Sequence, residues 1–237
     1  MNRFSTSILV LFSALVFLTS CGTTQQLTSS RKPAQIDSIF IMQPLTSIDV
    51  IPKKGKQFYD KESSDRAAVN VFESIERHIP KRIVKQYLEI DSTELFKIYD
   101  EIFKLTNQVE GKQSIENVPL SPEMMDLLTK NNFKFGIGSY CIGFIREKGQ
   151  YGKEIAPAIV LGVLIIAAEL LGGRYYGYYP HIPPKSISSV TCFIVDKSKK
   201  NIAFYRRNVT KGGEPISPKV IDEQVSDMLN AYFEKKR

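Results

Sequence analysis

Apolar residues recur every three or four positions in several stretches of the chain, a spacing that places them on one face of an α-helix. The first such helix is expected to be capped by Ser63 or Ser64 and to end before Pro80. The second starts at Asp91, where Glu94 three positions later forms a capping-box-like pair. The two apolar faces consist of Ala68, Val71, Phe72, Ile75 and Ile79, and of Leu95, Ile98, Tyr99, Ile102 and Phe103.

Two further helices are predicted where a serine precedes a proline, because the serine caps the helix and proline is tolerated at its first position. Ser121-Pro122 begins a short helix that runs to Asn131. Ser217-Pro218 begins the last helix of the chain. Its apolar stripe consists of Ile221, Val225, Met228, Leu229 and Tyr232.

Strands are predicted where apolar residues alternate or form short runs between turn residues. One run, Ile36 to Met42, is stopped by Pro44, and a second strand has Val84, Leu88 and Ile90 on one side. A longer strand has the alternating set Phe133, Phe135, Ile137, Cys141 and Ile145. Its glycines at positions 136, 138 and 143 do not form a phosphate-binding loop and indicate bends or close packing.

A β-hairpin is predicted near the end of the chain, where Ser189 to Val195 and Ile202 to Arg207 flank the polar loop 196–201. Helices and strands alternate first and finish in this hairpin and the last helix. The expected fold is α/β (α+β), with a single mixed β-sheet covered by helices, an apolar helical insertion, and a C-terminal β-hairpin plus helix.

The first apolar run, Ile8 to Leu18, follows a single positive charge and is too short to cross a bilayer, as in a signal peptide. The run ends Leu18-Thr19-Ser20-Cys21, which resembles the bacterial lipobox at all four positions. The resemblance implies that the Cys21 thiol receives a diacylglycerol, that cleavage precedes it, and that its new amino group is acylated, for example with palmitate. The alternatives are an ordinary cleavable signal with a coincidental cysteine, or an N-terminal anchor helix.

The expected organisation is a signal peptide at 1–20, a lipidated tether at 21–35 that contributes nothing to the core, and a periplasmic domain at 36–237. Two or three acyl chains hold a protein stably, since each buried methylene contributes about 0.8 kcal/mol. No acidic residue follows Cys21 closely. In lipoproteins of this kind, that pattern implies the periplasmic face of the outer membrane.

The least ordinary feature is an apolar insertion at 155–179. Ile155 to Leu171 contains only one charged residue, Glu169, and is shorter than the roughly 20 residues of a membrane-spanning helix. One interpretation is a helix that begins at Pro157 and packs on the domain or on a second subunit. The other is membrane contact, with the tyrosines at headgroup level. The residues proposed for such a contact are Ile159, Leu161, Ile165, Tyr175, Tyr176, Tyr178 and Tyr179.

Composition adds few constraints. Without the signal peptide 217 of the 237 residues remain, enough for one well-packed domain. The net charge of +7 is dispersed, with lysines at 53, 54 and 56, at 197, 199 and 200, and at the end of the chain. A dispersed basic surface is typical of a surface that contacts only solvent and has no dedicated site for a polyanion. The alternative is an anionic partner such as lipid headgroups.

Candidate chemistry is sparse. Cys141 and Cys192 each lie in a strand-like run, where they either form a disulfide or are buried as separate small apolar residues. His78 lies at a predicted helix end, where a favourable interaction with the helix dipole accounts for it, and His181 lies in a Tyr/Pro-rich loop. The sequence therefore predicts no metal site, no cofactor and no catalytic residues. The expected partners are the membrane, through Cys21, and an envelope protein or a second copy of the chain. Nucleic acid is not among them.

A further resemblance rests on the hairpin residues Ile194-Val195-Asp196 through Ile202-Ala203-Phe204-Tyr205. The chain resembles outer-membrane lipoproteins of the Bacteroidetes, in which an apolar segment precedes such a hairpin. The order of its elements also resembles the domain shared by peptidoglycan-synthase activators, the curli-secretion lipoprotein and the TolB N-terminal domain. These likenesses imply location and fold more than activity.

The sequence therefore favours a non-catalytic binding or assembly component of a cell-envelope complex. The alternatives are an oligomeric, membrane-contacting secretion or pore component, and a periplasmic enzyme of unrecognised type. An enzyme requires a deep polar pocket with converging titratable groups, whereas an assembly component requires an exposed apolar surface near the insertion.

Overall fold

This computed structural model describes residues 24–28, 32–54, 56–87, 92–109, 112, 114–116, 118–148 and 184–234. The described strands are β1 (Thr24–Thr28), β2 (Ser38–Ile41), β3 (Leu45–Ile51), β4 (Phe58–Tyr59), β5 (Val84–Gln86), β6 (Phe135–Arg146), β7 (Ile187–Asp196) and β8 (Asn201–Lys211). The described helices are the 3-10 helix η1 (Pro33–Gln35), α2 (Lys61–His78), α3 (Ser92–Val109), α4 (Pro122–Lys130) and α6 (Pro218–Phe233).

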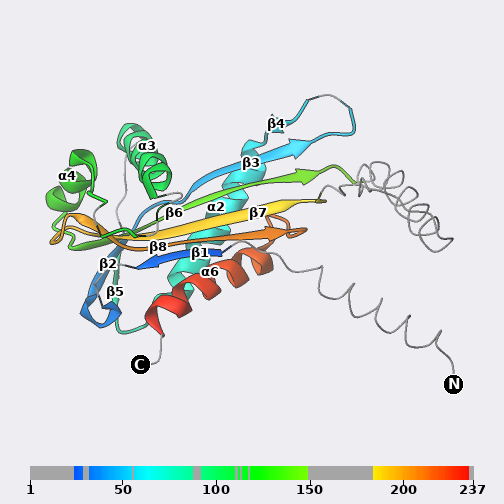
Figure 1. The fold of residues 1–237 in the computed structure, drawn as a ribbon. Coiled ribbons are helices and arrows are strands. Elements are labelled where there is room, and N and C mark those ends of the chain that lie inside the picture. The colour runs from blue at the N-terminus through cyan, green and yellow to red at the C-terminus, as the bar shows by residue number, and fades with distance from the viewer. Residues whose placement is uncertain are drawn as a thin grey trace, which may run out of the picture.

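The eight described strands form one mixed sheet, which confirms the predicted fold class (Figure 1). Its main order is β1-β8-β7-β6-β2-β5, with β3 beside β6 and β4 beside β3. The pairs β2 with β5, β2 with β6, and β3 with β6 are parallel, and the other pairs are antiparallel. Both β2 and β3 follow the same edge of β6, the first at Gly136 and Ile137 and the second from Tyr140 to Arg146.

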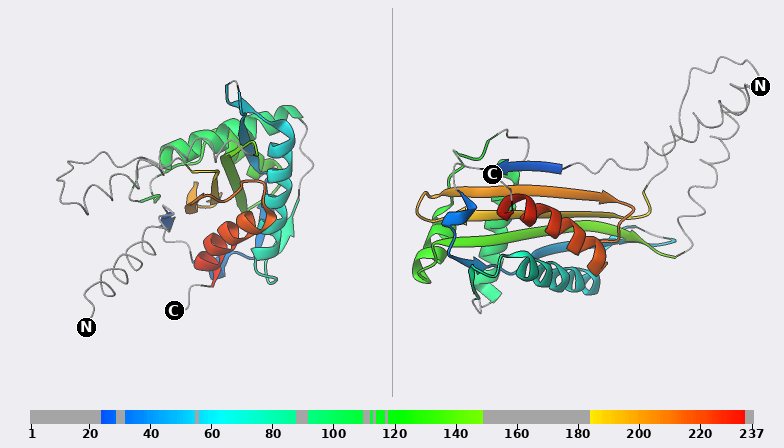
Figure 2. Two further views of the ribbon diagram at one scale, coloured as in Figure 1. Left: turned by 90° about the vertical axis from the view of Figure 1, so that its right-hand side faces the viewer. Right: turned by 90° about the horizontal axis from the view of Figure 1, so that it is seen from below.

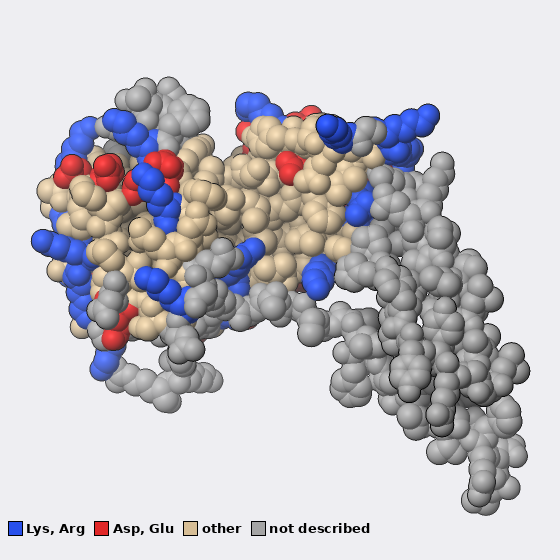
Figure 3. All heavy atoms as spheres, turned by 45° about the horizontal axis from the view of Figure 1, so that its top comes forward, with Lys and Arg blue, Asp and Glu red and all other residues tan. Residues whose placement is uncertain are grey.

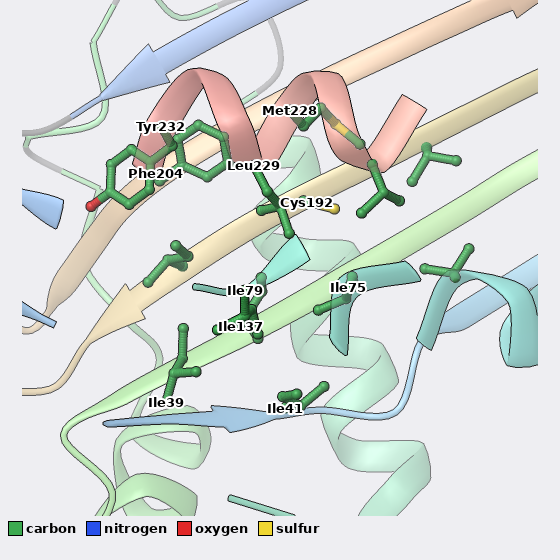
Figure 4. Close-up of a cluster of buried hydrophobic side chains, with 14 of the residues drawn as sticks. Ile39, Ile41, Ile75, Ile79, Ile137, Cys192, Phe204, Met228, Leu229 and Tyr232 are labelled. Carbon is green, nitrogen blue, oxygen red and sulfur yellow. The ribbon is translucent and has the colours of Figure 1, made fainter. Parts of the chain in front are cut away.

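One face of the sheet is covered by α2 and α6 (Figure 2). The two helices meet over the strands and enclose the larger hydrophobic core, part of which is drawn in Figure 4. The predicted stripe of α6 is buried here in full, as are Val71, Ile75 and Ile79 from α2 and its C-cap. Burial of such side chains contributes about 1.5 to 3 kcal/mol each, so this face carries much of the stability.

The other face is covered by α3 and α4 at the end of the sheet that holds the β7–β8 turn. Ile98 and Ile102 of α3 and Leu128 of α4 are buried in this second core. Phe133 belongs to it as well and stacks on Phe40 with ring centroids 4.5 Å apart. The expectation that Phe133 shares a face with Phe135 is therefore wrong, because β6 begins only at Phe135 and strand alternation does not extend before it.

Two of the predicted helix starts are confirmed by their caps. The Ser121 hydroxyl accepts a hydrogen bond from the Met124 amide, and the Ser217 hydroxyl accepts one from the Val220 amide. The start of α2 was misplaced by one turn: its cap is Asp60, whose carboxylate accepts from the Ser63 amide at 3.0 Å. Ser64 instead lies inside the helix, where its hydroxyl accepts from the Ile48 amide and joins α2 to β3.

Two expected apolar positions are exposed. Phe103 lies on the predicted helix α3 but is 47% exposed, and its ring meets Tyr140 edge-on at the sheet surface. Val84 is 62% exposed, because β5 is a short edge strand whose described part ends at Gln86. Leu88, Ile90 and Asp91 lie outside the described residues.

The glycines of β6 are explained by close packing, as expected. A Cβ at Gly138 would lie 2.3 Å from the Phe193 ring, and one at Gly143 would lie 2.2 Å from the Ile187 carbonyl oxygen. The predicted hairpin is also confirmed as β7 and β8.

The sequence did not predict β1, β3 or β4. The expected tether at 21–35 is structured in part, because β1 pairs with β8 from Thr24 opposite Asn208 to Thr28 opposite Phe204. Leu27 is half-buried and packs against the second core. Short polar segments of this kind give little periodicity, and their strand conformation comes from pairing with distant residues.

Candidate functional site

Several strands begin or end together at one end of the sheet, which we call the anchor end. Its limits are Ile51 of β3, Arg146 of β6, Ile187 of β7 and Lys211 of β8. The strand register aligns them, with Ile51 opposite Arg146 and Ile187 opposite Lys211. The β7–β8 turn lies at the opposite end, which we call the hairpin end.

The chain that leads to Cys21 leaves toward the anchor end. Strand β1 is antiparallel to β8, so its Thr24 end points in the direction of Lys211. Cys21 precedes Thr24 by three residues, which span at most about 11 Å in any conformation. Three residues of β8 separate Asn208, the partner of Thr24, from Lys211, a rise of about 10 Å. Covalent geometry thus limits how far Cys21 lies from the start of the sheet.

The segment that contains the apolar insertion also begins and ends at the anchor end. It connects β6, whose last described neighbour is Lys148, to β7, which Pro184 precedes. The two flanks lie side by side, because the Arg146 side chain donates a hydrogen bond from Nε to the Pro184 carbonyl at 3.2 Å. The Arg146 guanidinium also lies 5.6 Å from the centre of the Phe144 ring.

The described turns and strand ends at the anchor end are basic. They carry seven Lys or Arg side chains and two carboxylates, at Lys53, Lys54, Lys56, Arg146, Lys148, Lys185, Lys211, Glu147 and Glu214. Glu147 accepts a hydrogen bond from the Lys53 amide at 3.1 Å, and Lys185 pairs with Glu214 at 3.5 Å. The hairpin end is basic as well, since Lys197, Lys199 and Lys200 occupy its turn. Figure 3 shows Lys and Arg gathered toward both ends of the molecule.

Between α3 and the anchor end, the second face of the sheet carries a groove of about 460 Å³, which we call the open face. Apolar side chains form part of it, at Ile142, Phe144, Ile187 and Val209. Polar side chains complete the lining, at Ser47, Asp49, Gln57, Ser189 and Arg207. No residue of a described helix lines this groove. Helix α3 packs on the sheet at Tyr140. An apolar strip beside the flanks of the insertion is the feature expected of an assembly component.

Cys141 and Cys192 are free thiols, both buried in the core beneath α2 and α6. Cys141 is opposite Val190 and Cys192 is opposite Ser139, so the two cysteines are diagonal neighbours. Diagonal positions are about 7 to 8 Å apart, whereas a disulfide requires Cβ atoms about 3.8 Å apart. Burial raises the pKa of the Cys141 thiol to about 12 and raises that of Cys192 further, with a contribution from Cys141. Of the two alternatives that the sequence left open, this arrangement favours separate buried thiols over a disulfide.

His78 has a partner that the sequence did not reveal. Its Nε2 lies 3.1 Å from Oδ1 of Asp222 on α6, and the same oxygen accepts hydrogen bonds from Ser74 at 2.9 Å and Arg77 at 2.6 Å. Partial burial acts to raise the pKa of Asp222, but these hydrogen bonds and nearby positive charges outweigh it and the pKa is lowered. Ser74 and His78 both bind the carboxylate instead of each other, so the cluster joins two helices and is not a nucleophile activated by a base.

A smaller cavity of about 240 Å³ lies between α3 and α4. Its charged lining residues are Lys97, Glu101, Glu123, Asp126 and Lys130. Glu101, 4% exposed, is paired with Lys104 at 2.9 Å. Within the described ranges, no group of three or more His, Cys, Asp or Glu side chains is placed to hold a metal ion. None of the described helices is long and apolar enough to span a bilayer.

Most of the predicted site residues lie outside the described residues. This holds for Cys21, for Ile159, Leu161 and Ile165, for the tyrosines at 175, 176, 178 and 179, and for His181. The structure nevertheless places the chain that flanks them. It also brings Lys148, Lys185 and Lys211 together with the lysines at 53, 54 and 56, a grouping that depends on strand register and has no signature in the sequence.

Comparison with known proteins adds little. No protein-family model and no curated protein matches the chain. Among solved structures, the PelC dodecamer from Paraburkholderia phytofirmans is similar over 92% of this chain and 100% of that one, with a TM-score of 0.37 and 6% identity. A single-residue variant of the same PelC covers 88% and 96%, with a TM-score of 0.37 and 11% identity. Likeness at this level carries no argument about this chain.

Proposed function

We propose that this protein is a lipid-anchored, non-catalytic component of a cell-envelope complex, held at the periplasmic face of the outer membrane. The observation that carries the proposal is the convergence at the anchor end. The chain toward the lipobox cysteine and both flanks of the apolar insertion leave the sheet there. The proposed anchor and the insertion are therefore attached to the same end of the domain.

The open face supports a binding role. It presents apolar side chains near the described flanks of the insertion, whereas the cavity between α3 and α4 is small and its one buried carboxylate is already paired. These apolar side chains are half-buried, so they retain apolar area that a partner would cover. The partner is either another envelope protein or a second copy of this chain.

The anchor is tested by replacing Cys21 with alanine and labelling cells with an alkyne fatty acid. The variant is expected to lose the label and to remain uncleaved, because the peptidase of this pathway acts on the modified cysteine. Cys141→Ala is the matched control and should keep the label, since its thiol is buried in the core. Label retained on the Cys21 variant would rule out lipidation at this position.

The binding role is tested by placing a charge on the open face. Phe144→Glu should remove a complex seen by sedimentation of the detergent-extracted protein, because a carboxylate there would be desolvated by a partner. Val69→Glu is the control, since Val69 is 55% exposed on α2, away from the groove. Equal loss in both variants, or in neither, would contradict a role for the open face.

A further inference from the structure

We infer that the anchor end is a docking surface for anionic phospholipid headgroups, and that its lysines fix the orientation of the domain on the bilayer. The inference rests on the proposed lipid anchor and goes beyond it, because an anchor attaches a domain without choosing the face turned to the membrane.

The distance from the anchor is the first part of the argument. Cys21 lies within about 11 Å of Thr24, and its acyl chains would lie in the bilayer. Thr24 pairs with Asn208 on β8, so the sheet begins almost at the membrane surface, without a flexible tether of tens of residues. A domain held this closely meets the bilayer with the side from which the chain departs.

The charge on that side is the second part. Lys53, Lys54 and Lys56 are all exposed in the β3–β4 turn, and Lys148 and Lys211 are exposed beyond the ends of β6 and at the end of β8. Two carboxylates at this end, Glu147 and Glu214, offset part of this charge, and an excess of positive charge remains. A lysine near an anionic surface contributes about 1 kcal/mol, which corresponds to about fivefold in an equilibrium constant.

Charge alone does not select this end, because the turn at the hairpin end carries an equal set of three lysines, at 197, 199 and 200. The two ends differ in their distance from Cys21 along the path of the chain. The hairpin end lies about ten residues of β7 and β8 away, a distance of roughly 30 Å that exceeds the Debye length of about 8 Å at physiological salt. The β3–β4 turn and the β7–β8 turn therefore carry three lysines each and differ in their expected distance from lipid.

The experiment uses the full lipidated protein, extracted in detergent and reconstituted on the outside of vesicles of neutral phosphatidylcholine or of its mixture with phosphatidylglycerol. An amine-reactive reagent is added, and the labelling rate of each lysine is read by mass spectrometry. We expect the lysines at 53, 54, 56 and 211 to be labelled at least about fivefold more slowly on anionic vesicles than on neutral ones. The lysines at 197, 199 and 200 should be labelled equally on both.

Charge-reversed variants extend the test. Lys53→Glu, Lys54→Glu and Lys56→Glu together should abolish the slow labelling of Lys211, and the same change at 197, 199 and 200 should leave it. High salt should act like the first variant, since the Debye length falls to about 3 Å at 1 M. These variants alter exposed turns only and are expected to fold.

The outcomes are distinguishable. Equal labelling of both lysine sets on anionic vesicles would overturn the inference while leaving the anchor intact. Slow labelling at the anchor end that is the same on neutral and anionic vesicles would also overturn it, because proximity alone would then account for the protection. A protein that carries no acyl chains and does not stay with the vesicles would refute the proposed anchor, and this inference with it.

Discussion

Gln224 joins α6 to the sheet through a buried amide, and its removal gives a sharp test of the fold. The side chain is 2% exposed. Its Oε1 accepts a hydrogen bond from the Ser188 hydroxyl at 2.7 Å, and its Nε2 donates to the carbonyls of Ser188 at 3.0 Å and Asn208 at 3.1 Å. The amide therefore connects the helix to β7 and to β8 at once.

Gln224→Met keeps most of the side-chain volume, so the change removes the three hydrogen bonds without opening a large cavity. Each bond contributes about 1 kcal/mol, and their buried partners on β7 and β8 are left without this amide. We expect the free energy of unfolding to fall by about 3 kcal/mol, which lowers Tm by about 6 to 12 °C for a domain of this size. Thermal and urea unfolding followed by circular dichroism measure both quantities.

Gln57→Met is the matched control, because Gln57 is exposed and makes one hydrogen bond, to Asp49 at 2.6 Å. It should change stability by less than about 0.5 kcal/mol. Ser188→Ala should cost about 1 kcal/mol, and the double variant with Gln224→Met should cost less than the sum, since the two side chains share a bond. A loss below about 1 kcal/mol for Gln224→Met would refute the view that this amide holds α6 on the sheet.

Three further predictions follow from the fold. Asp222 has a pKa lowered in the folded state, so its contribution to stability is present above its unfolded pKa near 4 and is lost as pH falls through the folded value. The Tm difference between wild type and Asp222→Ala should be visible at pH 7 and shrink as pH falls below about 4. A thiol reagent at pH 8 should modify neither Cys141 nor Cys192 in the native protein and both after denaturation without reductant, because their raised pKa values and burial keep them unreactive; a pair that resists labelling after denaturation would reveal a disulfide. A chain that begins at Ser29 loses the pairing of β1 with β8 and should unfold with a free energy lower by about 2 kcal/mol than one that begins at Gly22, and identical urea midpoints would show that β1 adds nothing.

The sequence by itself determined much of the α+β fold. The periodic stripe of α6 and the alternation within β7 and β8 are local patterns, and each reports directly which side chains are buried. The serine-proline starts of α4 and α6 were readable for the same reason, since a cap is made within one turn of the helix. The string at Cys21 that resembles a lipobox is short, and the resemblance is found without knowledge of the fold.

Tertiary structure decided what local patterns do not encode. Strand β3 is half polar and β1 lies in a polar tail, and both are strands because β6 and β8 offer them backbone partners far away in the chain. The same register brings the lysine turn at 53–56, the flanks of the insertion and the chain toward Cys21 to one end of the sheet. Residues separated by more than a hundred positions become neighbours there through strand pairing, and no short window of the sequence contains both partners.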